Sequence, residues 1–365
     1  MSLVLRGIRK QVADEIQLYD TSADFKTGLN VLVGPTAAGK TSLLRIIAGL
    51  DKPTAGQIVC NGEDITFKPV RKRRVAIVYQ QYINYPNFTV YENIASPLRL
   101  AKLSKLEIDR RVQETASLLN IENLLLRLPS ELSGGQQQRV AIARALVKDA
   151  DIILMDEPLV NLDYKLREQL RRELRQIFTE SKKIAIYATT EPLEAALMGD
   201  NLVVVDAGKI LQSGDAATLF QMPASLRVAE ILSDPRINSL SLEVKDGKAT
   251  FQDFFTFDLR WQGEHPNGRY RMGLRPHHIN VKNKAAIAKT EVRFRATVAL
   301  AEVSGSETLI HVHFGEQHWI VQQAGVHQYQ LGEEIELQFS PEDVLLFDEN
   351  GINNNIASNK NAVVG

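Results

Sequence analysis

Over the first 230 residues, short apolar runs that end in turn signals alternate with stretches whose apolar residues recur at helical spacing. Short apolar runs bounded by Gly, Pro, Asp or Thr are typical of buried strands. Strands that alternate with helices predict a mostly parallel sheet covered by helices. The pattern therefore predicts an α/β domain, with strands expected in residues 29–35, 74–80, 151–158, 183–190 and 201–209.

Two further changes of pattern divide the chain. Between residues 82 and 150 the spacing is mainly helical, which predicts an inserted helical subdomain. After Asp234 and Pro235, runs such as 308–314 and 334–339 alternate apolar and polar residues, as in a small barrel or sandwich. We predict a first domain over residues 1–233, an all-β domain over 234–350 and a disordered, Asn-rich tail over 351–365.

Composition narrows the classes of function. The 365 residues carry a formal net charge of −1, which argues against a broad surface for nucleic acid, so we expect no nucleic-acid partner. The single cysteine, Cys60, excludes an internal disulfide framework and fits a reducing compartment. We see no signal-peptide pattern, and no run approaches the ~18 apolar residues that a membrane span needs. We expect a cytosolic chain that reaches a membrane only through a partner.

A glycine-rich loop directly follows the apolar run NVLV. Its sequence, GPTAAGKT at residues 34–41, matches G-x-x-x-x-G-K-[ST] between a predicted strand and a predicted helix, which is the context of a P-loop. Backbone N–H groups of such a loop turn toward phosphate oxygens at the positive end of the helix. Lys40 supplies a charge for the β- and γ-phosphates, and the Thr41 hydroxyl is placed to hold Mg²⁺. The expected ATP-binding residues are Gly34, Pro35, Thr36, Ala37, Ala38, Gly39, Lys40, Thr41 and Ser42.

A second candidate for chemistry is the acidic pair at the end of the run ADIILMDEP. The apolar residues bury this strand, so that Asp156 and Glu157 emerge at its carboxyl end, where open α/β sheets bind ligands. Asp156 suits the surroundings of Mg²⁺, and Glu157 suits activation of the attacking water. An acidic pair alone is also compatible with ordinary surface polarity; its place downstream of a P-loop favours the catalytic interpretation.

The most specific feature is LSGGQQQRVAIARALV, which begins at Leu132. Together with the P-loop and the acidic pair, it resembles the ATP-binding subunits of ABC transporters, and the resemblance covers nearly the whole chain. It implies that VYQQYINYP at 78–86 is the Q-loop, whose Gln80 couples nucleotide and Mg²⁺ to the membrane partner. It also implies that Asp163 is the acidic residue of the D-loop in EPLVNLDYKLR, where Val160 replaces the usual small polar residue.

The signature sequence also has a physical rationale of its own. Ser133, Gly134 and Gly135 precede a predicted helix, so that a hydroxyl and free N–H groups gather at its positive end. The resemblance implies that this receptor, which runs from Leu132 to Gln136, closes over the γ-phosphate held by a second subunit. Two chains would then enclose two nucleotides. A plain Ser-Gly-Gly helix cap without a ligand is the alternative for the tetrapeptide alone.

The C-terminal part narrows the resemblance. GLRPHHI at 273–279 and VSGSETLIHV at 303–312 resemble the extra, TOBE-type domain of the ATPases that serve maltose and glycerol phosphate uptake. There the domain is a small OB-like barrel that mainly contacts its counterpart in the other subunit. We therefore predict an ABC ATPase domain of the α/β P-loop class, followed by a small all-β OB-like domain. His311, His313 and His318 could form part of a metal site, but surface histidines are the favoured interpretation.

Two residues depart from the family pattern. The family usually has a histidine after the last catalytic strand, and this chain has Thr190 there, in YATTEPLEA. All seven histidines lie at or beyond His265, so none replaces it by a shift of register. The family's adenine-stacking aromatic would fall at Val12, which has no aromatic face, and Tyr19 is the nearest aromatic residue. Both departures affect the nucleotide site that the chain's own P-loop builds, whereas the signature is intact.

Because both departures affect the chain's own nucleotide site and neither affects the signature, they suggest a subunit that pairs with a non-identical ATPase whose own site is complete. Homodimeric pairing, and an ATP-binding regulatory subunit with little hydrolysis, are the alternatives. In YATTEP and VYQQYINYPN the chain resembles the ATPases of bacterial glycerol importers that employ two unlike ATPase subunits. The resemblance further implies two transmembrane permease subunits, a periplasmic or extracellular solute-binding protein, and a location on the cytoplasmic face of a bacterial membrane. The chain shows one ATPase cassette, which disfavours ABC proteins that act on ribosomes or DNA.

Overall fold

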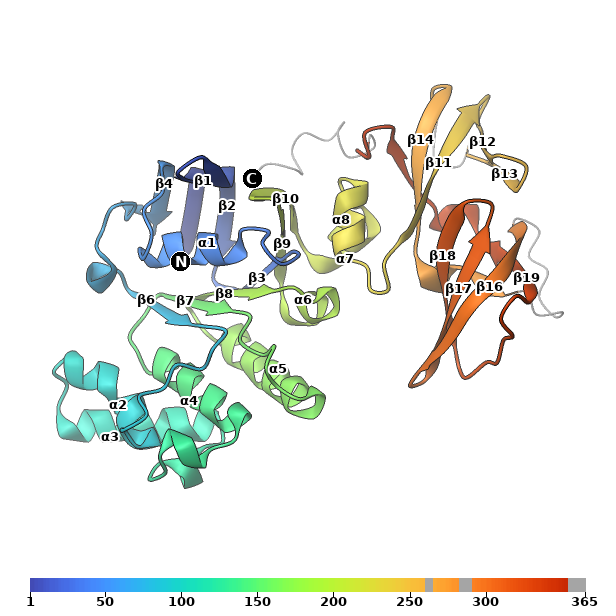
Figure 1. The fold of residues 1–365 in the computed structure, drawn as a ribbon. Helices are drawn as coiled ribbons and strands as arrows, with labels where there is room; N and C mark the ends of the chain where they lie inside the picture. Colours follow the sequence, from blue (N-terminus) through green and yellow to red (C-terminus); the bar gives the residue numbers. More distant parts are fainter. Residues whose placement is uncertain (260–264, 282–290, 354–365) are drawn as a thin grey trace. The chain divides into compact units, whose positions relative to one another are not determined.

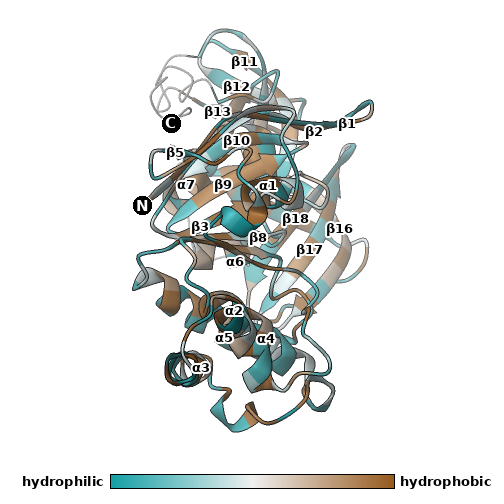
Figure 2. Cartoon of the chain, turned by 90° about the vertical axis from the view of Figure 1, so that its left-hand side faces the viewer, coloured by the Kyte–Doolittle hydropathy of each residue, from teal (hydrophilic) through white to brown (hydrophobic). Residues whose placement is uncertain are grey.

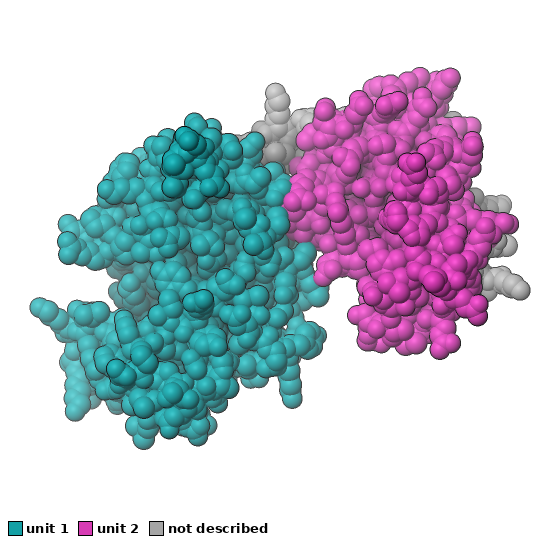
Figure 3. Space-filling view, viewed as in Figure 1, with its two compact units in different colours: residues 1–219, 364–365 teal, residues 220–363 magenta. Residues whose placement is uncertain are grey.

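The computed structural model describes residues 1–259, 265–281 and 291–353. The chain separates into two compact units, one of which comprises residues 1–219 while the other begins at Phe220 (Figure 3). The domain boundaries predicted at 233 and 350 stay predictions. Of the predicted tail, Ile352 forms a β-bridge with Ser225, and residues 354–365 lie outside the described residues.

The first unit is built around a mostly parallel sheet, as the apolar runs predict (Figure 1). Its strand order is β10-β9-β3-β8-β7-β6, in which β10 alone is antiparallel to its neighbour among these described strands. The apolar composition of these strands is visible along β9 in Figure 2. The strands are β3 (Gly28–Val33), β6 (Val75–Val78), β7 (Ile152–Asp156), β8 (Ile184–Thr189), β9 (Asn201–Asp206) and β10 (Lys209–Gly214).

An antiparallel sheet, which the sequence analysis did not predict, completes this unit. Its strand order is β2-β1-β4-β5, and helix α1 (Lys40–Ala48) packs its apolar residues against both sheets. Leu43, Leu44, Ile46 and Ile47 of this helix are fully buried. The strands are β1 (Ser2–Val12), β2 (Glu15–Lys26), β4 (Ala55–Cys60) and β5 (Glu63–Asp64).

The other face of the parallel sheet is covered by α5 (Tyr164–Thr179) and α6 (Pro192–Met198), both of which contact β3. The buried residues of α5 are Leu170, Leu174 and Phe178. They recur every four residues, so one apolar stripe of the helix faces the sheet, and most of its other residues are charged or polar. The active-site loops described below connect these strands and helices.

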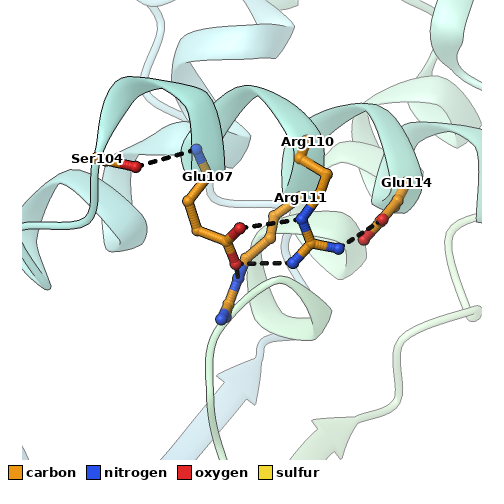
Figure 4. A network of polar contacts seen from close by, with 5 residues as sticks. All are labelled: Ser104, Glu107, Arg110, Arg111 and Glu114. Carbon is orange, nitrogen blue, oxygen red and sulfur yellow. Dashed lines mark hydrogen bonds and ion pairs between the residues drawn. The ribbon is translucent and has the colours of Figure 1, made fainter.

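The predicted helical subdomain is formed by α2 (Val90–Leu100), α3 (Lys105–Leu118) and α4 (Gly134–Leu146). On α3, Ser104 caps the helix by accepting a hydrogen bond from the Glu107 N–H, and Arg110 bridges two glutamates (Figure 4). Hydrogen bonds from Arg110 and Arg111 hold the pKa of Glu107 at about 2. Because this network is solvent-exposed, we assign it to the local stability of the helix and to no chemistry.

The second unit is all-β apart from short helices, which confirms the predicted fold class. Its apolar core joins two sheets and includes the fully buried rings of Phe339 and Trp319. The first sheet contains β11 (Asn238–Lys245), β12 (Lys248–Phe251), β13 (Phe255–Asp258), β14 (Gly268–Leu274) and β20 (Leu345–Asp348). The second contains β15 (Asn280–Val281), β16 (Val292–Ser304), β17 (Glu307–Phe314), β18 (Gln317–Ala324) and β19 (Glu334–Phe339). Helices α7 (Ala216–Gln221) and α8 (Leu226–Ile231) precede them.

Candidate active site

The loop between β3 and α1 has the backbone that its glycines predict. A Cβ added at Gly34 would lie 2.0 Å from the Val205 carbonyl oxygen, so no larger residue fits there. Gly39 has a φ of 104°, a conformation that other residues rarely adopt, and α1 begins at the next residue. The strand, loop and helix expected around residues 34–41 are thus present, and the backbone N–H groups of the helix start face this loop.

Two pairs of side chains connect this loop to the end of β7. The Lys40 Nζ lies 3.3 Å from Glu157 Oε1 and donates to the Gly34 carbonyl at 2.8 Å. The Thr41 hydroxyl donates to Asp156 Oδ1 at 3.1 Å. Burial lowers the pKa of Lys40 and raises the pKa of Asp156, although each lies near a group of opposite charge that favours its ionised form. The structure therefore brings the predicted cation, hydroxyl and carboxylates together.

Glu157 is held in an uncommon backbone conformation. Its φ is 45°, and its N–H donates to the Ala188 carbonyl of β8 at 3.0 Å. A non-glycine residue with positive φ is uncommon and is found more often at functional sites, where surrounding contacts enforce it. The bend points the chain away from the sheet directly after the acidic pair.

Lys40, Thr41 and Glu157 line one pocket of about 570 Å³. Thr36, Ala37, Ala38, Gly39, Lys40, Thr41, Ser42, Gln80 and Glu157 contribute to its walls, as predicted sites should. Five further residues line the pocket that no motif in the sequence predicts: Glu15, Ile16, Gln17, Ala207 and Gly208. They come from the start of β2 and the β9–β10 turn, and the only signals in the sequence were the turn residues on either side of those strands.

Val12, at the position where the family pattern places an adenine-stacking residue, pairs with Glu15 of the pocket wall, and its role stays a prediction. Val12 ends β1, is 48% exposed, and is not among the residues that line this pocket. Tyr19 does line the pocket, and the Lys209 Nζ lies 5.2 Å from the centre of its ring. The aromatic surface nearest to the P-loop pocket is therefore that of Tyr19.

The segment that follows β6 is attached to the helix of the signature sequence. Asn84 Nδ2 donates to the Gln137 carbonyl at 2.9 Å, and Arg144 donates to the Ile83 carbonyl. Asn161 Nδ2 donates to the carbonyl of Gln80 at 3.2 Å. Gln80, at the pocket, is thus linked to both α4 and the loop that precedes α5.

Ser133 begins α4 with a reciprocal capping box. The Gln136 N–H donates to Ser133 Oγ at 3.4 Å, and the Ser133 N–H donates to Gln136 Oε1 at 3.0 Å. Gly135 packs so closely on α5 that an added Cβ would lie 1.8 Å from Leu166 Cδ2. Leu132 is buried beneath this turn. The signature residues are not among those lining the P-loop pocket of the same chain.

The loop before α5 ends at Asp163, whose carboxylate accepts a hydrogen bond from the Leu166 N–H at 3.0 Å. Asp163 is therefore the N-cap of α5, a position that carboxylates favour. Gly134, the first residue of α4, lies near Tyr82: a Cβ added at Gly134 would be 3.3 Å from the Tyr82 hydroxyl.

Thr190 lies on the turn between β8 and α6. A very small cavity, of about 10 Å³, is enclosed by residues on this turn together with Glu157, Val160 and Arg167. Thr190 is therefore close to the carboxylate that was predicted to activate water. All seven histidines lie in the second unit, far along the sequence from this turn.

The histidines on β17 and β18 form no metal-ligand cluster. His313 and His318 pack with ring centres 3.9 Å apart, and His311 Nε2 lies 3.7 Å from Glu302 Oε2. In the described residues, no group of three or more His, Cys, Asp or Glu side chains is arranged to hold a metal ion. Nor does any described helix combine the length and apolar composition that crossing a membrane requires.

Comparisons with known proteins identify the family of the chain. Residues 19–160 match the ABC transporter family, and residues 272–347 match the TOBE domain. The trehalose/maltose import ATP-binding protein of Thermococcus litoralis is 36% identical over 94% of this chain and 97% of its own length. The sn-glycerol-3-phosphate import ATP-binding protein of Escherichia coli K12 is 35% identical, with 87% and 89% of the two chains covered.

Solved structures resemble the first unit. An ATP-binding cassette in a dimeric post-hydrolysis state with ADP and Pi is 29% identical, with a TM-score of 0.53 over 59% of this chain and 98% of that chain. A component of an ABC transporter complex from Clostridium perfringens is 25% identical, with a TM-score of 0.57 over 60% of this chain and 90% of that chain. The chain therefore belongs to the ATP-binding proteins of ABC transporters, and it is a transporter ATPase with a C-terminal TOBE domain.

Proposed function

We propose that this chain hydrolyses ATP to power the import of a small carbohydrate or polyol through membrane subunits. One observation carries the proposal: a single pocket unites Lys40, Thr41, Gln80 and Glu157, and Asp156 is bonded to Thr41. The relatives support the transported class, because their names describe import of trehalose or maltose and of sn-glycerol-3-phosphate. Glycerol is the finer proposal for the solute.

In the proposed reaction, the P-loop N–H groups and Lys40 hold the ATP phosphates. Thr41, Asp156 and Gln80 offer the oxygen atoms that Mg²⁺ prefers, and the 3.1 Å contact of Thr41 with Asp156 fits such a donor set. The ion supplies positive charge against the phosphate oxygens. Glu157 orients a water molecule toward the γ-phosphate and accepts its proton.

The contact of Glu157 with Lys40 is relevant to this role. A nucleotide between the two side chains would engage the lysine amine with phosphate and release the carboxylate for water. The Glu157 carboxylate would then be in position at the carboxyl end of β7, and the strand would not need to move.

A second, apolar groove supports the proposed membrane partners. It measures about 330 Å³ and lies between the first unit's core and its helical subdomain. Its walls include the exposed side chains of Leu50, Val70, Tyr85 and Leu100. Tyr85 belongs to the segment that runs from Gln80 to α2, so a permease segment bound here would touch the chain that leads to the nucleotide pocket. We place the chain on the cytoplasmic membrane face, with two permease subunits and a solute-binding protein beyond them.

Pairing with a second, non-identical ATPase is the finer proposal for assembly. Three observations favour it over a homodimer: Thr190, beside Glu157, replaces the family's histidine, Val12 replaces its aromatic residue, and the Ser133 helix start is intact. The chain's own site would then be slow, while its signature completes the partner's site. A regulatory subunit with little hydrolysis is the extreme form of this proposal, and the retained Glu157 argues against it.

The test is co-purification of the chain with its membrane partners, followed by ATPase and solute-uptake assays in proteoliposomes. ATP-dependent uptake of a carbohydrate or polyol is expected, and its absence with every such solute would contradict the proposal.

The assay is repeated with and without the second ATPase. Full hydrolysis with this chain as the sole ATPase would show a homodimer, whereas hydrolysis that needs the second subunit supports the unequal pair. Thr190→His is expected to raise hydrolysis at the chain's own site by about tenfold or more.

A further inference from the structure

An ion pair joins the loop that follows Glu157 to the turn that carries Thr190. The Arg167 guanidinium, in the first turn of α5, donates to Glu191 Oε1 at 2.7 Å. Its other terminal nitrogen donates to the carbonyls of Val160 and Leu162, at 3.4 and 3.3 Å. One side chain therefore holds three acceptors on two segments that are separate in the sequence.

The turn itself is fixed from its other side. The Glu191 N–H donates to Thr189 Oγ1 at 3.1 Å, and that hydroxyl donates to Glu194 Oε2 at 2.5 Å. Thr189 and Glu194 are buried, with 2% and 6% of their surface exposed. Two contacts thus hold the turn: the buried hydrogen bond between Thr189 and Glu194, and the ion pair between Arg167 and Glu191. Thr190 lies between Thr189 and Glu191 in the sequence.

The space between these groups is small. Arg167, Glu191, Thr190 and Glu157 all line the cavity of about 10 Å³, a volume at the lower limit for a single water molecule. A displacement of the loop relative to the turn would therefore change the distance from Thr190 to Glu157 directly. Removal of the guanidinium would free the two segments from each other.

We propose that Arg167 is a positioning residue for hydrolysis, which acts through Glu191 to hold Thr190 at a fixed place beside Glu157. This inference rests on the proposed role of Glu157 in hydrolysis. The planar guanidinium is suited to the task, because its fork of N–H donors reaches a carboxylate and two carbonyls at once, whereas a lysine amine offers one point. Movement of the loop 159–163 is thereby transmitted to Thr190.

Because the Arg167–Glu191 pair is partly exposed, an experiment can distinguish a positioning role from a purely structural one. The side chains of Arg167 and Glu191 are 24% and 48% exposed, and exposed pairs contribute little to stability. Loss of the pair should therefore leave folding intact while it disturbs geometry at the site. A misplacement of about 1 Å is sufficient to reduce turnover by up to 10²-fold.

The experiment compares Arg167→Ala, Glu191→Ala and the double variant in the assembled transporter on a Ser133→Ala background. Because Ser133 is proposed to complete the partner's site, this background lets kcat and KM for ATP report this chain's own site, and Tm is measured for each variant. We expect each single variant to lower kcat about 10- to 100-fold. KM for ATP and Tm should stay near the values of the background protein, and the double variant should be no slower than the slower single variant. Arg167→Lys should recover part of the rate. Arg171→Ala is the matched control, because Arg171 lies one turn along α5 and pairs with Glu168 of the same helix.

Multiplicative losses in the double variant, an unchanged kcat in Arg167→Ala, or a fall in Tm that parallels the loss of activity would each overturn the inference. A wild-type transporter without ATPase activity would instead contradict the proposed function. In that case, binding of a non-hydrolysable ATP analogue to the variants would still report whether the nucleotide pocket is intact.

Discussion

The amine of Lys40 lies 3.3 Å from the carboxylate of Glu157, across the pocket that the P-loop shares with the end of β7. Lys40 is 4% exposed, and burial lowers its pKa even though Glu157 and Asp156 favour the charged form. The two groups come from segments more than a hundred residues apart, and only the parallel order of β3, β8 and β7 brings them together. This contact is the basis for the first prediction.

Glu157→Gln should abolish most hydrolysis and leave ATP binding in place. The amide keeps the size of the side chain but cannot accept the proton of water, and loss of a general base typically lowers a rate about 10²- to 10⁴-fold. The measurement is kcat in the assembled transporter together with the affinity for a non-hydrolysable analogue. Glu180→Gln, on the exposed end of α5, controls for the loss of one carboxylate and should behave as wild type. On a Ser133→Ala background, which disables the partner's site that this chain is proposed to complete, turnover by Glu157→Gln within tenfold of the background protein would remove Glu157 from the mechanism.

Ser133 and Ser104 make a matched pair of helix caps. Each accepts a hydrogen bond from the N–H three residues later, so replacement of either by alanine should destabilise its helix by a similar amount, about 1 kcal/mol. Only Ser133→Ala should also reduce ATPase activity of the assembled transporter, because only this cap is proposed to meet the partner's γ-phosphate. Equal effects of the two variants on activity would show that Ser133 is a structural cap alone.

Tyr19 and Val12 give a similar comparison at the nucleotide pocket. Tyr19 is 41% exposed and lines the pocket, whereas Val12 is 48% exposed and does not. Stacking of a base on an aromatic ring contributes about 1–3 kcal/mol. We therefore expect Tyr19→Ala to raise KM for ATP about tenfold or more, and Val12→Ala to leave it unchanged. A larger effect of Val12→Ala would return the adenine contact to the position that the family pattern assigns.

These comparisons show which parts of the site the sequence alone could predict. The P-loop, the acidic pair and the strands around them are local patterns, and the structure contains them where periodicity and glycine spacing indicate. Ile16, Gln17 and Gly208 could not be assigned, because their approach to the P-loop depends on how the antiparallel sheet packs on α1. The contact of Arg167 with Glu191 likewise depends on the positions of α5 and α6 on one face of the sheet, which no spacing encodes.

Glu194 should make stability depend on pH. Burial raises the pKa of this carboxyl, although Thr189 donates a hydrogen bond to it. In the unfolded chain it titrates near about 4.3. Between that value and the higher folded pKa, the native protein holds a proton that the unfolded chain has lost, so stability falls as pH rises. The contribution is complete below the unfolded pKa and is lost as pH rises through the folded pKa.

Glu194→Gln removes this titration and keeps an oxygen for the Thr189 hydroxyl. The difference in Tm between Glu194→Gln and wild type should therefore grow in favour of the variant as pH rises above about 4.3, and it should level off once the folded carboxyl is ionised. Thermal unfolding of the purified chain over this range measures the difference, with Glu180→Gln as the exposed control. A constant difference would mean that folding leaves the pKa of this carboxyl unshifted, and a difference that shrinks with rising pH would mean that the buried carboxylate is stabilised in its charged form. In that second case Glu194 would carry a fixed negative charge next to the turn of Thr190, and the Thr189 hydroxyl would donate to a charged carboxylate.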